Sequence, residues 1–277
     1  MNYALISDIH ANAAALQIVL DKCRERRVDK IINLGDAVGY GSRPNECCEM
    51  LIAHGVTSIA GNHDLAACGV FEPVYFQPEA RRRMLWTRAV LSASNRRFLE
   101  ALPEALVIDN AFVIVHGSLK SSSQYLLTEK AIVQSFALLK KNYPELRVCF
   151  FGHTHKAVTH EWNNAEWRSD EALQIKLNVE SLYLINPGSI GYPRYAESPL
   201  SFAIYDSGNK TVRLIRLEEG SGQLQRDMQP DIALDAALAR QYLQFAAKAG
   251  ARFIRNRFLH RAPSGALKRN SPTGKNF

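Results

Sequence analysis

Short apolar runs that end directly in polar turns are the feature that most constrains this chain of 277 residues. Five such runs read as buried strands because their apolar residues are continuous rather than alternating: 3–7, 30–34, 57–60, 111–115 and 148–151. Continuous apolar strands are typical of sheets that are covered on both faces. The sequence therefore predicts a layered α/β fold.

Helical periodicity between these strands predicts three helices, from Asn12 to about Arg27, from Pro44 to His54 and from Thr128 to Lys141. Residues 66–103 read as a helical insertion between two strands. Three further strands are predicted in a β-rich second half, at 181–185, 201–205 and 211–217. Near the end of the chain, a long helix is expected over 230–259, and residues from 263 on have the composition of a disordered end.

Five polar motifs follow the predicted strands of the first half of the chain. They are Asp8-Ile9-His10, Gly35-Asp36-Ala37-Val38-Gly39, Gly61-Asn62-His63-Asp64, His116-Gly117 and Gly152-His153-Thr154-His155. Ligands of open α/β sheets bind at the carboxyl ends of strands, so motifs at these positions can converge on one site. Five of the eight histidines of the chain lie in these motifs, which indicates shared chemistry.

Carboxylate oxygens, an amide oxygen and imidazole nitrogens make up the candidate ligands. This mixed set suits Mn²⁺, Fe, Zn²⁺ or Ni²⁺, whereas Mg²⁺ and Ca²⁺ prefer nearly all-oxygen sites. In an extended segment, residues i and i+2 point the same way, so we expect Asp8 and His10 to hold one ion together, and likewise His153 and His155. Seven candidate ligands are too many for one tetrahedral ion and fit two ions that share a carboxylate.

Each motif alone has a purely structural alternative. Asp-x-His is a common triplet, Gly-Asp at a strand end is more often a turn, and Gly61-Asn62-His63-Asp64 could form a left-handed turn. Two imidazoles at i and i+2 after an apolar strand, as in His153 and His155, are seldom placed there for packing. The ordered combination of all five motifs favours a metal centre over the structural alternatives.

The ordered motifs, spread over residues 1–217, resemble the calcineurin-like metallophosphoesterase superfamily. Gly39-Tyr40-Gly41 and the run from Asn186 to Gly191 resemble its small bacterial and archaeal phosphodiesterases, although these usually have Gly at the position of Ala11. Protein Ser/Thr phosphatases of the superfamily carry Asp-Arg where this chain has Gly39 and Tyr40, which weakens a protein-phosphatase interpretation.

The resemblance implies a four-layer α/β/β/α sandwich of two mixed sheets flanked by helices. It would occupy residues 1–217, with residues 218–277 as a C-terminal helical extension and basic tail. The implied activity is hydrolysis of phosphate esters, phosphodiesters ahead of phosphomonoesters, by in-line attack of a hydroxide shared by two ions. The alternatives are a phosphomonoesterase or protein phosphatase, a nucleic-acid-directed phosphoesterase and a non-catalytic scaffold.

The resemblance also implies a role for each motif residue. One ion would be held by Asp8, His10, Asp36 and His155, and the other by Asp36, Asn62, His116 and His153. Mn²⁺ is the first choice of metal, with Fe, Zn, Ni and Mg as alternatives. His63 would protonate the leaving oxygen or stabilise the transition state, and Asp64 would orient His63 or support a ligand histidine.

Four residues are weaker candidates for binding a small phosphoester substrate: Asn12, Tyr40, Arg43 and Arg194. Asn12 is equally suited to be only a helix cap, and a surface salt bridge is the favoured interpretation of Arg194. The insertion carries Phe71, Tyr75, Phe76, Trp86 and an arginine run at 81–83. It could be a lid that selects the substrate, or the arginines could simply form a solvated helix face.

Charge and cysteine usage indicate the setting of the protein. Residues 241–277 hold eight basic and no acidic side chains, and the rest of the chain has a net charge of −1, so the overall +7 comes from this tail; nucleic acid could bind there but is not favoured. The five cysteines form no CxxC pair, the N-terminus lacks a signal-peptide pattern and no run of 18 apolar residues occurs. We expect a cytoplasmic protein without a membrane segment, whose oligomeric state the sequence does not specify.

Overall fold

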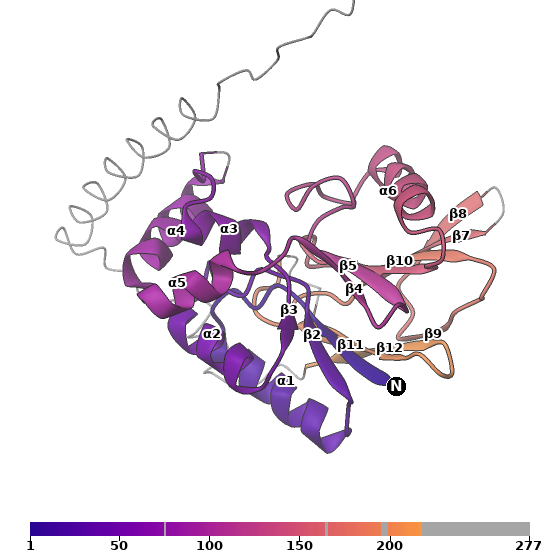
Figure 1. Cartoon of the computed structure of the whole chain (residues 1–277), viewed down its shortest axis with the longest axis horizontal. Coiled ribbons are helices and arrows are strands. Elements are labelled where there is room, and N and C mark those ends of the chain that lie inside the picture. Colours follow the sequence, from indigo (N-terminus) through magenta and orange to yellow (C-terminus); the bar gives the residue numbers. More distant parts are fainter. Residues whose placement is uncertain (75, 164–165, 195–198, 218–277) are drawn as a thin grey trace, which may run out of the picture. The chain divides into compact units, whose positions relative to one another are not determined.

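The computed structural model describes residues 1–74, 76–163, 166–194 and 199–217, all within the first of the two units into which the chain divides, Met1–Leu234. In this part, two six-stranded mixed sheets lie face to face with helices on their outer faces (Figure 1). This arrangement confirms the predicted four-layer sandwich. The helix expected over 230–259, the extension from residue 218 and the basic tail lie outside the described residues.

The first sheet has the strand order β3-β2-β1-β11-β12-β9. Its strands are β1 (Asn2–Ile6), β2 (Lys30–Asn33), β3 (Thr57–Ser58), β9 (Gln174–Lys176), β11 (Ser201–Asp206) and β12 (Thr211–Arg216). The first three run parallel, and β11, β12 and β9 continue the sheet in antiparallel pairs. Two helices, α1 (Ala13–Glu25) and α2 (Pro44–Ala53), cover the outer face of this sheet.

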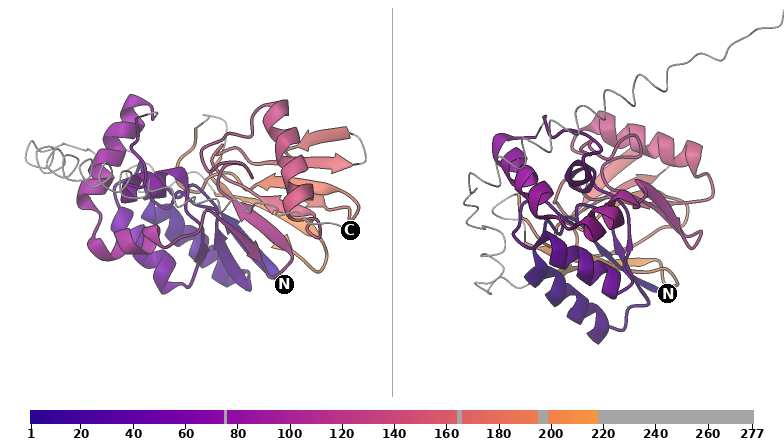
Figure 2. Two further views of the ribbon diagram at one scale, coloured as in Figure 1. Left: turned by 45° about the horizontal axis from the view of Figure 1, so that its top comes forward. Right: turned by 60° about the vertical axis from the view of Figure 1, so that its left-hand side comes forward.

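The second sheet has the strand order β4-β5-β6-β10-β7-β8. Its strands are β4 (Ala105–Ile108), β5 (Phe112–Val115), β6 (Val148–Phe150), β7 (Val158–Asn163), β8 (Glu166–Asp170) and β10 (Leu182–Asn186). The central strands β5, β6 and β10 are parallel. Helix α6 (Glu129–Asn142) covers the outer face of this sheet, and Figure 2 shows it on the opposite side from the indigo helices of the first sheet.

Three apolar clusters hold the four layers together. Alternate residues of β1 serve two of them: Tyr3 and Leu5 point between the sheets, whereas Ala4 and Ile6 point toward α1. The third cluster joins the second sheet to α6 through residues such as Phe136. Each fully buried large apolar side chain contributes about 1.5–3 kcal/mol, so these clusters supply the rigid frame on which the strand ends are held.

The predicted insertion between β3 and β4 consists of α3 (Asn62–Cys68), α4 (Pro78–Val90) and α5 (Ala93–Glu100). It begins earlier than residue 66, because the Gly61 N–H donates to the Asp64 carboxylate at 3.0 Å and so starts a helix at Asn62. The Gly-Asn-His-Asp motif therefore forms the first helical turn and not a left-handed turn. Among the described residues, no helix combines the length and apolarity needed to cross a membrane.

Candidate metal centre

The five motifs meet where strands from both sheets end. Asp8 and His10 follow β1, Asp36 follows β2, and Asn62 follows β3 through Gly61, whereas His116 follows β5 and the two histidines of residues 153–155 follow β6. All seven predicted ligands are buried, and none of them is more than 5% exposed. Strand ends of both sheets thus bring side chains from residues 8 to 155 into one site.

Left-handed backbone conformations concentrate in these motifs. Asp8, His10, Asp36, His153 and His155 have φ between +48° and +67°, which non-glycine residues seldom adopt. Such conformations cost about 1–3 kcal/mol each and gather at functional sites. The extended backbone that we expected for the i and i+2 pairs is therefore wrong. Asp8 and His10 nevertheless fall in one group of side chains, whereas His153 and His155 belong to two different groups.

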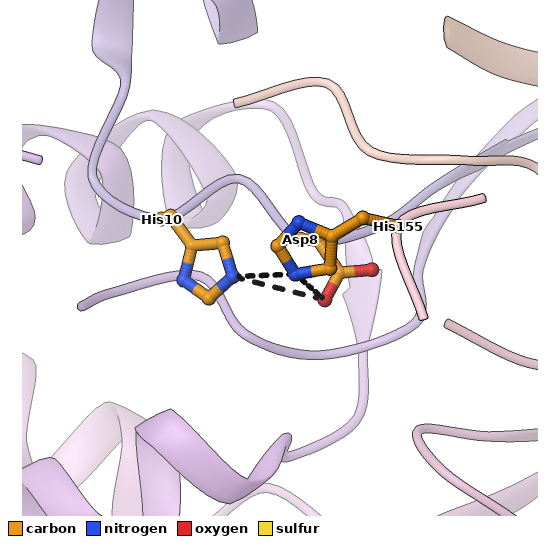
Figure 3. Close-up of side chains that lie close together, drawn as sticks. All are labelled: Asp8, His10 and His155. Atoms are coloured by element: carbon orange, nitrogen blue, oxygen red, sulfur yellow. Dashed lines mark hydrogen bonds and ion pairs between the residues drawn. The ribbon is translucent and has the colours of Figure 1, made fainter. Parts of the chain in front are cut away.

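The first group contains Asp8, His10 and His155, whose side chains point toward one another in Figure 3. The Nε2 atom of His155 lies 3.3 Å from Oδ1 of Asp8 and 3.1 Å from Nε2 of His10. Nε2 of His10 is also 3.8 Å from Oδ2 of Asp36. Ligands that are about 2.0–2.2 Å from one ion lie about 3.0–3.5 Å from each other, so the shorter spacings suit a shared cation.

The second group contains Asp36, His116 and His153. Oδ2 of Asp36 lies 3.2 Å from Nε2 of His116, and this nitrogen is 3.1 Å from Oδ1 of Asn62. Because the same Asp36 oxygen also faces His10, it lies between the two groups. Asp36 Oδ1 accepts the His63 backbone N–H at 2.8 Å, which holds the carboxylate in this orientation.

In each of the four predicted ligand histidines, one ring nitrogen forms a hydrogen bond with a main-chain carbonyl oxygen. The pairs are His10 Nδ1 with Val38, His116 Nδ1 with Leu34, His153 Nε2 with Ser123 and His155 Nδ1 with Tyr192. A carbonyl oxygen can only accept, so the nitrogen that faces it donates and the other nitrogen is free to act as a ligand. This fixes Nε2 as the ligand atom of three histidines and Nδ1 as that of His153.

The two carboxylates of the site are fully buried and have no lysine or arginine within 4.0 Å among the described residues. Burial raises the pKa of Asp36, yet His116 and His63 hold this pKa well below its usual range. Burial likewise opposes ionisation of Asp8, and His155 lowers the pKa of its carboxyl. In turn, Asp36 raises the pKa of His116 to about 9, although burial acts to lower it.

Asp8 Oδ1 and Asp36 Oδ2, the two oxygens that face the groups, receive no hydrogen bond from the described residues. Buried ionised oxygens without donors are costly unless a cation compensates them. The residues present therefore fit divalent metal ions.

His63 lies beside these groups. Burial lowers the pKa of His63 to about 4, and its ring centre is 4.8 Å from that of His10. Its ring nitrogen also lies within 4.8 Å of the ligand atoms of His10 and Asp36, so it faces the same space.

The Asp64 carboxylate accepts the N–H groups of Val38 and Gly61 at 3.1 and 3.0 Å. Its contacts thus hold the loop after Asp36, and the catalytic role expected for Asp64 stays a prediction.

A cavity of about 790 Å³ opens over His63, Asn62 and His153. Of the four predicted substrate-binding residues, Tyr40 and Arg194 line it. Arg194 donates to the Tyr125 hydroxyl at 2.6 Å. The cavity is of the size that small-molecule sites usually have.

The other two substrate candidates make contacts within the fold. Asn12 is fully buried; its Oδ1 accepts the Ala15 N–H at 3.0 Å and its Nδ2 donates to Gly191 O at 3.1 Å. It is therefore a helix cap that also holds the loop at Gly191, and a role in substrate binding stays a prediction. Arg43 does not line the cavity, and its guanidinium pairs with Glu46 one helical turn along α2.

Two tyrosines of the cavity were not predicted. Tyr125 stacks on the His153 ring with 3.9 Å between ring centres, and Tyr192 stacks on Tyr40 with 4.3 Å. Tyr192 directly follows the Asn186–Gly191 motif, and this position was a usable signal. Tyr125 follows a run of three serines and carries no such signal.

The Asn186–Gly191 motif supports the metal-binding loops. Nδ2 of Asn186 donates to Gly152 O at 2.7 Å, and the Ser189 hydroxyl donates to Asp8 O at 2.9 Å. Residues from the end of β10 thereby fix the turns that carry Asp8 and His153. This motif thus has a structural role: its residues hold the turns that carry the predicted metal ligands and are not ligands themselves.

Comparisons with known proteins place these observations in a wider context. The calcineurin-like phosphoesterase superfamily domain matches residues 1–210. The uncharacterized protein MJ0912 of Methanocaldococcus jannaschii is 34% identical over 221 residues, which cover 78% of this chain and 86% of that protein. A metallophosphoesterase from Sphaerobacter thermophilus has a similar structure, with a TM-score of 0.70, 30% identity and coverage of 88% of this chain and 99% of that one. The hypothetical protein PH1004 of Pyrococcus horikoshii OT3 shares the fold, with a TM-score of 0.67, 18% identity and coverage of 86% and 96%.

Proposed function

Because the chain belongs to the calcineurin-like phosphoesterase superfamily, we propose that it is a metal-dependent hydrolase that cleaves phosphodiesters in preference to phosphomonoesters. The observation that carries this proposal is the pair of buried, ionised carboxylates, Asp8 and Asp36, facing histidines whose free nitrogens point at them. A cytoplasmic location stays a prediction, to which the five free cysteines are suited.

In the proposed site, Asp8, His10 and His155 hold one divalent ion, and Asn62, His116 and His153 hold the other. Asp36 is shared, because its Oδ2 atom faces both groups. When bound, the two ions supply a water that is activated at neutral pH and neutralise charge on the phosphoryl oxygens. Mn²⁺ is the metal we favour, since it accepts mixed nitrogen and oxygen ligands.

His63 and Arg194 are the two residues that we assign to the substrate itself. Both line the cavity, so the neutral imidazole can give a hydrogen bond to the leaving oxygen and the guanidinium can bind a phosphoryl oxygen. Tyr125 orients Arg194 through the hydrogen bond between its hydroxyl and the guanidinium. A diester carries a second substituent that a monoester lacks, and a cavity of about 790 Å³ has room for it.

The test compares the hydrolysis of bis(4-nitrophenyl) phosphate and 4-nitrophenyl phosphate by the Mn²⁺-loaded chain. We expect kcat/KM for the diester to be at least about tenfold higher, and kcat to fall about 100-fold or more in His63→Ala. His54→Ala, which changes an exposed histidine after α2, is the matched control. Equal turnover by the native chain and His63→Ala would contradict the role of His63, and preference for the monoester would favour a phosphomonoesterase.

A further inference from the structure

One wall of the cavity is aromatic, and the insertion supplies most of it. Phe71 and Phe76, from the segment between α3 and α4, line the cavity and are only partly buried. The Phe76 ring centre lies 4.7 Å from that of His63 and 6.3 Å from that of Phe71. The aromatic wall, as we call Phe71 and Phe76, therefore begins at a proposed catalytic side chain and continues from Phe76 to Phe71.

Two more rings and a polar group surround the same space. Tyr40 and Tyr192 are stacked with an interplanar angle of 11°, and both line the cavity. Gln77 precedes α4 and also lines it, and its side chain does not cap the helix. The cavity thus offers flat apolar faces together with an amide that can both donate and accept hydrogen bonds.

Helix α4 holds this wall in place. Arg88 is buried and donates to the carbonyl oxygens of Ala66 and Phe71 at 2.6 and 2.7 Å. Arg83 donates to Tyr40 O at 2.8 Å, which fixes the loop on the other side of the cavity. Surfaces that are ordered before binding lose less entropy when a ligand arrives. Because the aromatic wall is held in place before a ligand arrives, it is suited to bind one.

A bare phosphate would need neither the volume nor the rings of this cavity. Stacking of a base on an aromatic side chain raises the binding affinity by about tenfold or more per base. We propose that the phosphoester bound here is a mononucleotide ester, with its base against the aromatic wall and its phosphate at His63 and Arg194. The place of the phosphate rests on the proposed function, whereas the place of the base rests on Phe71, Phe76 and Gln77.

Two ligands that differ only in the base test the proposal without catalysis. Calorimetry on the full chain with Mn²⁺ compares adenosine 5′-monophosphate with ribose 5-phosphate. We expect the nucleotide to bind at least about tenfold more tightly and this ratio to fall by about threefold or more in Phe71→Leu. Phe98→Leu removes the same atoms from α5, away from the cavity, and serves as the control that keeps the native ratio. Equal affinity for the two ligands would overturn the proposal.

Two diesters with the same leaving group separate this proposal from the proposed function. Thymidine 5′-(4-nitrophenyl) phosphate should be cleaved with a kcat/KM at least about tenfold above that of methyl 4-nitrophenyl phosphate. If both are cleaved equally well, the nucleotide proposal is wrong while the hydrolase stands. If neither is cleaved but the base still strengthens binding, the proposed function fails and the base site stands. If an oligothymidylate binds more tightly than the mononucleotide, with a steep salt dependence, the ligand is a single-stranded nucleic acid and the proposal is refuted.

Discussion

At the scale of single residues, Asn12 is a side chain near the site whose described contacts lie within the fold. Its amide caps α1 and binds Gly191 O, and both contacts are buried. Asn12→Ala should destabilise the protein by about 2 kcal/mol, about half from the cap and half from the second hydrogen bond. Asn12→Ser, which keeps an acceptor for the cap, should lose about half as much. Urea denaturation measures both, and an increased KM without loss of stability would show that Asn12 binds substrate instead.

His160, on β7, gives a pH dependence that is separate from the metal centre. Burial, followed by Lys156, lowers its pKa to about 4 from an ordinary 6.5. Its Nδ1 pairs with the Ser169 hydroxyl at 2.7 Å, whereas its buried Nε2 has no partner among the described residues. A proton on this ring is therefore taken up more readily by the unfolded chain.

The contribution of neutral His160 to stability is complete above pH about 6.5 and is lost as the pH falls toward 4. The loss amounts to at most about 3.5 kcal/mol, since one pKa unit corresponds to about 1.4 kcal/mol. Urea unfolding of the native chain and of His160→Gln should show a difference in stability that shrinks over this pH range. A difference that is constant from pH 7 to pH 4.5 would contradict the lowered pKa.

At the scale of elements, α4 links the insertion to the loops around the cavity through its buried arginine. Besides the two carbonyl groups, Arg88 pairs with Glu72 at 3.0 Å. Arg88→Met removes the donor to Phe71 O and one of the two donors to Ala66 O, which also accepts the Gly69 N–H at 3.0 Å, and should cost about 2–4 kcal/mol. Arg82→Met, on the exposed side of the same helix, should cost less than about 1 kcal/mol. Urea unfolding measures both, and similar small losses would mean that Arg88 does not anchor the wall.

The elements differ in how far their sequences reveal them. Apolar central strands such as β1 and β5 and capped helices such as α1 are predictable, because burial on both faces and capping residues leave a clear pattern. The edge strands β8 and β9 are not, since most of their residues are exposed and β8 reads Glu-Trp-Arg-Ser-Asp. Their pairing partners, rather than their own residues, make them strands.

The same distinction applies to the site. The seven ligand candidates are identifiable from motifs at strand ends, and the structure brings them together in two groups that meet at Asp36. Cavity residues such as Tyr125 depend on how loops from different sheets meet, which no local pattern encodes. The arginine run of α4, open to a solvated-face interpretation from sequence, is divided by the fold: Arg83 binds the Tyr40 carbonyl, and Arg82 is exposed.

At the scale of the whole molecule, the site depends on two sheets that each supply part of it. The first sheet carries Asp8, His10, Asp36 and Asn62, and the second carries His116, His153 and His155. The packing between Tyr3 and Phe112, with ring centres 5.0 Å apart, is one of the contacts that holds the sheets in this relation. The net charge of +7 comes from residues 241–277 and does not describe this site, whose excess charge is negative before a metal binds.

The central claim is that one shared carboxylate holds two divalent ions at the junction of the sheets. Equilibrium dialysis of the full chain against Mn²⁺, followed by elemental analysis, tests it most directly, with Asp36→Asn as the variant and Asp206→Asn, on an exposed turn after β11, as the control. We predict about two ions per chain in the native protein and the control, and at most about one in Asp36→Asn. Fewer than one ion per native chain, or the same ion content in Asp36→Asn as in the native protein, would contradict the account.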